Sequence, residues 1–176
     1  MGGVLSASAI VSILDSCVAP AEGEVWTPEF FTVEEGKVMT KIADLLIPAT
    51  DTPGALDALV PQFVDRVSAK MLSNEEGKAF VRNGFKALAT ACKKATGKDF
   101  LSCTAEEQIA FLQAEEKAAI TSKEPTLFGF LKEAIYRGFF TSEAAANEVL
   151  IFDPVPGNYD GCIPYAEVNG TWAPHR

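Results

Sequence analysis

Repeated helix-start signals are the feature that most constrains how this chain can fold. Three helix starts are predicted from a Ser or Thr that is followed three residues later by Glu. This is the spacing of a capping box, in which each side chain accepts the other residue's backbone N–H. The three pairs are Thr32 with Glu35, Ser73 with Glu76, and Thr104 with Glu107. Ser142 can cap a further, short helix through the alanines at 144–146. These signals predict a mainly helical chain.

Apolar residues behind these starts recur at the spacing of one helix face. Pro48 and the turn at 51–54 end the first helix, and the second begins near Pro61. Gly97 caps the third, and Pro125 lies in the first turn of the fifth. The predicted faces are Val38, Ile42, Leu45 and Leu46; Phe63, Val67 and Met71; Val81, Phe85, Leu88 and Cys92; Ile109 and Leu112; and Phe128, Leu131, Ile135 and Phe139. We therefore predict an all-α fold, with about five to six helices in one domain over residues 27–176.

The character of the sequence changes after Leu150. Prolines, glycines and aromatic residues alternate through 151–162, which predicts an ordered, turn-rich tail. Asn169-Gly170, placed between Val168 and Trp172, predicts one small β-hairpin. A stiff, aromatic-rich tail can dock on a partner or wrap back over its own helices, and both interpretations remain open.

Residues 1–26 form a separate N-terminal segment. Its stretch 4–14 is apolar and rich in small residues, as in an export signal, but the first basic residue of the chain is Lys37. We expect the remnant of an export signal; a helix that packs on a partner is the alternative. The residues before Cys17 resemble a lipoprotein cleavage site, which makes Cys17 a candidate for lipidation, and Met1-Gly2 with Ser6 fits a myristoylation pattern. Both patterns are short and frequent by chance.

Features of catalysis and of nucleic-acid binding are scarce in this sequence. The formal net charge is −9, which repels a phosphate backbone. The only histidine is His175, next to the last residue, and no phosphate-binding loop, GxSxG or CxxCH motif occurs. Paired glutamates such as Glu34-Glu35 fall in first helical turns, where they complement the helix dipole. We predict no catalytic, cofactor-binding or metal-binding residues in this chain.

The cysteines are Cys17, Cys92, Cys103 and Cys162, at spacings that suit no zinc site. Cys92 falls on an apolar helix face, which favours a buried thiol. If the protein is exported, either Cys92 with Cys103 or Cys103 with Cys162 could form a disulfide. The spacing does not choose between these pairs.

Two long motifs give the sequence a family resemblance. The first is LIPATDTPGA at 46–55 followed by VPQFVD at 60–65, and the second is GFFTSE at 138–143 with DPVPGNYDGC at 153–162. In order and spacing they resemble the gluconate 2-dehydrogenase subunit 3 family, over roughly residues 27–172.

The resemblance implies a non-catalytic small subunit of an exported, periplasmic dehydrogenase complex. Its large partner would be a flavoprotein of the glucose–methanol–choline type that holds FAD and oxidises a sugar, sugar acid or glycoside. A third subunit, a c-type cytochrome with haem c, commonly accepts the electrons. Membrane association would come through the complex or through a lipid anchor. Family members usually carry a twin-arginine export signal, and the small subunit is thought to escort the flavoprotein during export. This sequence departs from the family in lacking those arginines.

We expect the partner interface to lie in the two motifs, because the helix faces do not account for them. The expected interface residues are Asp51, Pro53, Gly54, Phe139, Phe140, Asp153, Pro154, Pro156, Tyr159 and Cys162. Two other classes of function stay open: a free-standing maturation chaperone without a stable complex, and a small enzyme that uses carboxylates alone.

Overall fold

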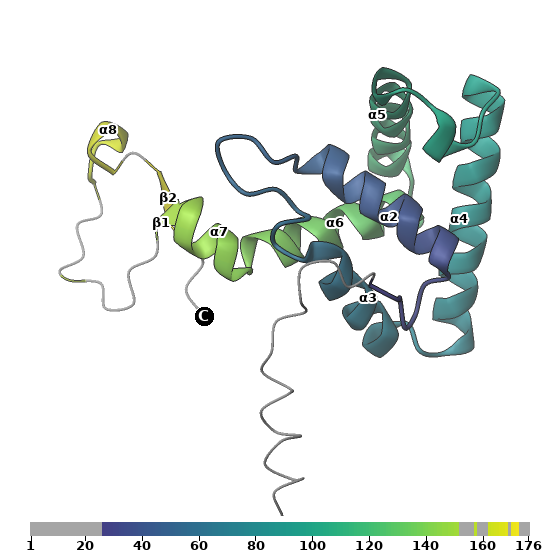
Figure 1. The fold of residues 1–176 in the computed structure, drawn as a ribbon, viewed down its shortest axis with the longest axis horizontal. Helices are drawn as coiled ribbons and strands as arrows, with labels where there is room; N and C mark the ends of the chain where they lie inside the picture. The colour runs from purple at the N-terminus through teal and green to yellow at the C-terminus, as the bar shows by residue number, and fades with distance from the viewer. Residues whose placement is uncertain (1–25, 152–156, 158–161, 169, 173–176) are drawn as a thin grey trace, which may run out of the picture.

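A computed structural model describes residues 26–151, 157, 162–168 and 170–172 of the chain (Figure 1). Several sequence-based predictions therefore lie outside the described residues. They are those for the N-terminal segment with Cys17, and for Asp153, Pro154, Pro156, Tyr159 and His175.

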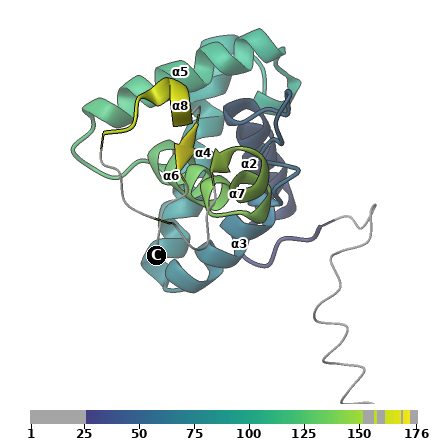
Figure 2. The ribbon, with the colours of Figure 1, turned by 90° about the vertical axis from the view of Figure 1, so that its left-hand side faces the viewer.

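Helices make up most of the described chain, which confirms the all-α prediction. The elements are α2 (Val33–Leu46), α3 (Val60–Met71), α4 (Glu75–Thr96), the 3-10 turn η1 (Phe100–Ser102), α5 (Ala105–Thr121), α6 (Leu127–Phe140), α7 (Glu143–Glu148), β1 (Leu150–Ile151), α8 (Tyr165–Val168) and β2 (Thr171–Trp172). Helix α6 is central and contacts α2, α3, α4, α5 and α7. Seen from the α7 end, α5 crosses the top of the molecule and α3 lies below α6 (Figure 2).

The apolar faces predicted for α4 and α6 form the centre of the core. All four residues of each face are buried: Val81, Phe85, Leu88 and Cys92 on α4, and Phe128, Leu131, Ile135 and Phe139 on α6. On α2 the face is turned relative to the prediction. Met39, Ile42 and Ala43 are fully buried, while Val38, Leu45 and Leu46 are only half-buried. On α5, Leu112 is buried as expected but Ile109 is exposed, because Phe111 takes the inward position.

The face predicted for α3 is only partly correct: Phe63 is half-buried against the core, but the fully buried residues are others. Val60, Val64 and Ser68 are fully buried, whereas Met71 is 70% exposed. The cause is Asp65, which is 1% exposed and accepts hydrogen bonds from the chain that precedes α2. Turning Asp65 inward rotates the helix and carries Met71 out to solvent.

Two of the three predicted capping boxes are present, at Thr32–Glu35 and Thr104–Glu107. Gly97 ends α4 in the left-handed conformation with φ 76°, and Ser142 caps α7, both as predicted. The box at Ser73 is wrong because Asn74 caps α4 through a 2.8 Å bond from the Gly77 N–H to its Oδ1.

Two further local predictions are wrong. Pro125 precedes α6 and does not enter its first turn, because Thr126 is the cap. The predicted hairpin does not form either, since the residues before Asn169 make the short helix α8. Instead β2 pairs in parallel with β1, Leu150 with Thr171 and Ile151 with Trp172. A parallel pair needs a crossover connection, and the long segment between β1 and β2, which includes α8, supplies it.

Candidate partner interface

The first motif builds a closed loop over residues 47–59. The Ala55 N–H donates to the Ile47 carbonyl at 2.9 Å, and the Gly54 N–H donates to the Asp57 carboxylate at 2.8 Å. A Cβ on Gly54 would lie 2.5 Å from the backbone nitrogen of Ala49, so only glycine fits at this crossing. This loop therefore has a fixed shape, and Gly54 is buried inside it.

The outer side of the same loop presents its remaining residues to solvent. Asp51 is exposed at the tip, and Pro53 is half-buried. Leu56 and Leu59 are 41% and 45% exposed, and Leu59 has the unusual φ of 52° at the start of α3. Left-handed backbone at a leucine carries strain that the surrounding structure must hold in place.

The end of the first motif and the start of the second meet inside the fold. A Cβ on Gly138 would lie 2.7 Å from Cδ1 of Phe63, so the missing side chain lets α3 and α6 approach closely. Phe139 is 3% exposed and belongs to the core, whereas its neighbour Phe140 is 41% exposed. Of the interface residues expected here, Phe140 remains outward, while Gly54 and Phe139 serve the fold.

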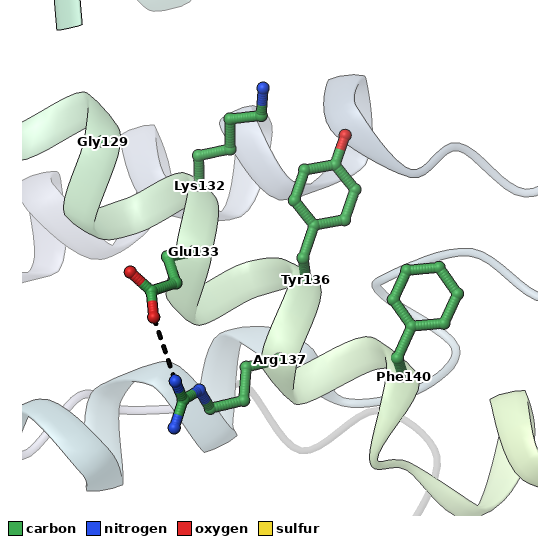
Figure 3. A pocket seen from close by; sticks show the side chains of 6 residues that line it. All are labelled: Gly129, Lys132, Glu133, Tyr136, Arg137 and Phe140. Carbon is green, nitrogen blue, oxygen red and sulfur yellow. Dashed lines mark hydrogen bonds and ion pairs between the residues drawn. The ribbon is translucent and has the colours of Figure 1, made fainter. Parts of the chain in front are cut away.

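The outward face of α6 carries an aromatic strip, defined here as Lys132, Tyr136 and Phe140 (Figure 3). The rings of Tyr136 and Phe140 stack at 6.3 Å with an interplanar angle of 16°. The Lys132 ammonium lies 5.8 Å from the centre of the Tyr136 ring, within the range of a cation–π contact. The strip lies along a shallow groove of about 450 Å³, which Gly129 also lines.

The charges around the aromatic strip are neutralised within the chain. Arg137 donates to Glu133 at 2.9 Å, one helical turn apart (Figure 3). Lys132 forms an ion pair with Glu116 of α5. A partner that covers this face therefore meets two stacked rings beside paired charges.

A second apolar surface lies along α2, and the sequence patterns did not predict it. We call it the α2 groove; its apolar lining comes from four segments: Trp26, Val33, Leu56 and Leu101. Val33 is 55% exposed because it follows the Thr32 cap on the outer side of the helix. The signal available in the sequence was that Val33 and Leu101 fall outside every predicted helix face.

The segment before α2 is held against the bundle by two polar side chains. The Asp65 carboxylate accepts the backbone N–H groups of residues 29, 30 and 31 at 2.7, 3.1 and 3.0 Å. Arg82 of α4 donates to the Phe30 carbonyl at 2.6 Å, pairs with Glu35, and lies 5.5 Å from the centre of the Phe30 ring. These contacts fix the chain that carries Trp26 to the α2 groove.

The shifted pKa values have structural causes. Burial raises the pKa of the Cys92 thiol and that of the Glu115 carboxyl. The pKa of Glu107 is lowered first by the hydrogen bond that it accepts from Lys98 and second by the one that it accepts from the backbone N–H of Thr104. The hydrogen bond between Lys98 and Glu107 also raises the pKa of Lys98. A backbone N–H also lowers the pKa of Glu106 in the first turn of α5. These shifts arise from helix capping and burial and do not indicate a matched acid–base pair.

The structure places the remaining predicted site residues as follows. Cys162 is exposed just before α8. Cys92 and Cys103 lie side by side, with their Sγ atoms 3.9 Å apart. Within the described ranges, no three His, Cys, Asp or Glu residues gather closely enough to hold a metal ion. No helix in the described part of the chain is both long and apolar enough to cross a bilayer.

Fold and surface together define a small helical protein with two partly apolar surface hollows, one along α6 and one along α2. A family model described as gluconate 2-dehydrogenase subunit 3 matches residues 33–157, well over half of the 176 residues, and the chain belongs to this family. The match confirms the resemblance carried by the two motifs, and the family's description is that of a subunit of a dehydrogenase. No curated protein and no solved structure matches the chain.

Proposed function

We propose that this chain is the non-catalytic small subunit of a periplasmic, FAD-dependent sugar dehydrogenase complex of the gluconate 2-dehydrogenase or glucoside 3-dehydrogenase type. It binds and stabilises the flavoprotein that carries FAD and the activity, and it escorts that flavoprotein during export. A c-type cytochrome with haem c completes the complex as electron acceptor. Family membership supports the association with a dehydrogenase.

The observation that carries the proposal is the aromatic strip on α6. Each of its residues follows a buried residue of α6 by one position, so the strip lies beside the buried face, and core packing does not account for the 41% exposed ring of Phe140. Tyr136 and Phe140 are anchors of the kind that dominate protein interfaces, because each offers a large rigid surface at a low cost in conformational entropy. Fully burying one such ring contributes about 1.5–3 kcal/mol.

The exposed tip of the 47–59 loop extends this surface. The residues Asp57–Leu59 and α7 line one shallow hollow, and α7 begins three residues after Phe140. The end of this loop and Phe140, the last residue of α6, thus lie at the same end of the molecule, and the tail follows α7 and β1 along the chain. We propose that Asp51, Pro53 and Phe140, together with Asp153, Pro154, Pro156, Tyr159 and Cys162 of the tail, contact the flavoprotein.

Stabilisation and escort follow from one physical effect. A protein that binds only the folded flavoprotein lowers the free energy of that state by mass action, by about 2.7 kcal/mol when it is present at 100 times its Kd. A partner held folded in this way crosses the membrane as one unit with its subunit.

Co-purification tests the proposal. The full chain is tagged, expressed with its neighbouring genes and purified, and the visible spectrum and native mass of the eluate are recorded. We expect a second, larger chain with the absorption of oxidised flavin, and haem bands if the cytochrome is retained. A colourless species with the mass of this chain alone would contradict the stable complex and favour the free-standing chaperone. Hydrolase or isomerase activity of the isolated chain would favour the carboxylate enzyme instead.

A further inference from the structure

Two thiols meet where α4 ends and α5 begins. Cys92 is fully buried on the inner face of α4, and Cys103 is partly exposed just after η1. Their Sγ atoms are 3.9 Å apart, and the Thr96 hydroxyl lies 3.8 Å from Cys92 Sγ and 3.4 Å from Cys103 Sγ. A disulfide has its sulfurs about 2 Å apart, so each sulfur needs to move by only about 1 Å.

We propose that Cys92 and Cys103 are a built-in disulfide site, oxidised when the chain meets a small disulfide oxidant. That this happens in the cell rests on the export included in the proposed function, since oxidising compartments supply such oxidants. The site itself follows from the juxtaposition of the two sulfurs. It selects one of the two pairings that the cysteine spacing left open.

The exchange proceeds in two steps. The more accessible Cys103 attacks, as its thiolate, one sulfur of the oxidant and expels the other half as a thiol, which leaves a mixed disulfide on Cys103. Cys92 then attacks Cys103 Sγ, the Cys92–Cys103 bond forms, and the second half of the oxidant leaves as a thiol. The two cysteines lose two electrons and two protons, and the oxidant's disulfide is reduced to two thiols.

The bond would fix one wall of the α2 groove. The chain that it closes, residues 92–103, contains the end of α4 and all of η1. Phe100 of η1 is buried and its carbonyl accepts the side-chain amide of Gln108 at 2.8 Å, while Leu101 lines the α2 groove. Oxidation would therefore restrict the motion of Leu101 at that surface.

Peptide mapping of the full chain tests the site. The reduced protein is treated with oxidised glutathione, unreacted thiols are alkylated, and the protein is digested with trypsin. Cleavage after Lys93, Lys94 and Lys98 separates Cys92, in 87–93, from Cys103, in 99–117. We expect these two peptides to be joined until a reductant is added, and the melting temperature to rise by about 5–10 °C on oxidation.

Two variants serve as matched controls. Cys162→Ser should keep the joined peptides and the rise in melting temperature, whereas Cys103→Ser should lose both. The proposal is overturned if wild-type Cys103 ends as a glutathione adduct, pairs with Cys162, or stays reduced while an unfolded sample oxidises. Because the mapping uses the wild-type chain, it gives an answer even if a variant fails to fold. It also gives an answer whether or not a flavoprotein co-purifies.

Discussion

Helices α6 and α3 pack against each other, yet their sequences predict their buried faces with different success. On α6 every residue of the predicted apolar face is buried. On α3 the apolar spacing favours Phe63, Val67 and Met71, but the buried face is Val60, Val64, Asp65 and Ser68. The spacing of apolar residues predicts the buried face of a helix only when no polar side chain of that helix forms buried hydrogen bonds.

The largest loss of stability is expected from removing Asp65, the buried carboxylate of α3. Asp65→Ala leaves the three N–H groups of residues 29–31 without their buried acceptor, and we expect a loss of about 3–5 kcal/mol in the free energy of unfolding. Urea unfolding followed by circular dichroism measures this. Asp51→Ala, at an exposed loop position, is the control and should change stability by less than about 0.5 kcal/mol. A loss of under 1 kcal/mol for Asp65→Ala would show that this carboxylate does not orient α3.

The contact between the two helices gives the next largest effect. In most helix interiors Gly→Ala stabilises, but a Cβ at Gly138 would lie 2.7 Å from the Phe63 ring. We expect Gly138→Ala to destabilise by about 1–2 kcal/mol in thermal or urea unfolding. In a Phe63→Ala background the same change should cost less, because the clash is gone. Equal costs in both backgrounds would contradict this close packing.

The N-cap of α4 allows the same comparison between two adjacent residues, Asn74 and Ser73. Asn74→Ala removes the side chain that accepts the Gly77 N–H, so a loss of about 1 kcal/mol is expected. Ser73→Ala, one residue earlier, should be nearly neutral. If urea unfolding showed a larger loss of stability for Ser73→Ala than for Asn74→Ala, the predicted capping box at Ser73 would be correct instead.

The smallest effect concerns a carboxyl that, unlike Asp65, has no partner among the described residues. Burial raises the pKa of Glu115 above its ordinary value of 4.5, so the folded state favours the protonated form. Its contribution to stability is present below pH 4.5 and is lost as the pH rises through the higher folded pKa. Glu115→Gln should therefore raise the melting temperature slightly at pH 7 and leave it unchanged near pH 4. A stabilisation that is the same at both pH values would contradict this assignment.

Short sequence patterns predicted most of the fold, because the capping residues that begin and end most of these helices are adjacent to them in the sequence. The boxes at Thr32 and Thr104, the cap at Gly97 and the face of α6 each depend on residues close in sequence. The orientation of α3 depends on a bond between residues more than 30 positions apart, which no local pattern reveals. The parallel pairing of β1 with β2 was missed for the same reason.

The candidate interface was predicted only in part. Phe140 and the loop tip follow from the motifs, but Gly54 and Phe139 of the same motifs are buried. Tyr136 was recognisable only as the residue one turn before Phe140, beside the buried face of α6. The α2 groove gathers side chains from four separate segments, so its existence depends on the tertiary fold.

The central claim is that the outward face of α6 binds the flavoprotein, and one co-purification ratio tests it most directly. The Tyr136→Ala/Phe140→Ala double variant is co-expressed with the neighbouring genes beside Ile120→Ala, which removes a 77% exposed apolar side chain from α5. Flavin recovered per mole of tagged chain is measured for both, and circular dichroism confirms that both are folded. We expect at least a tenfold loss for the double variant and wild-type recovery for Ile120→Ala. Equal flavin recovery from the two folded variants would contradict the claim.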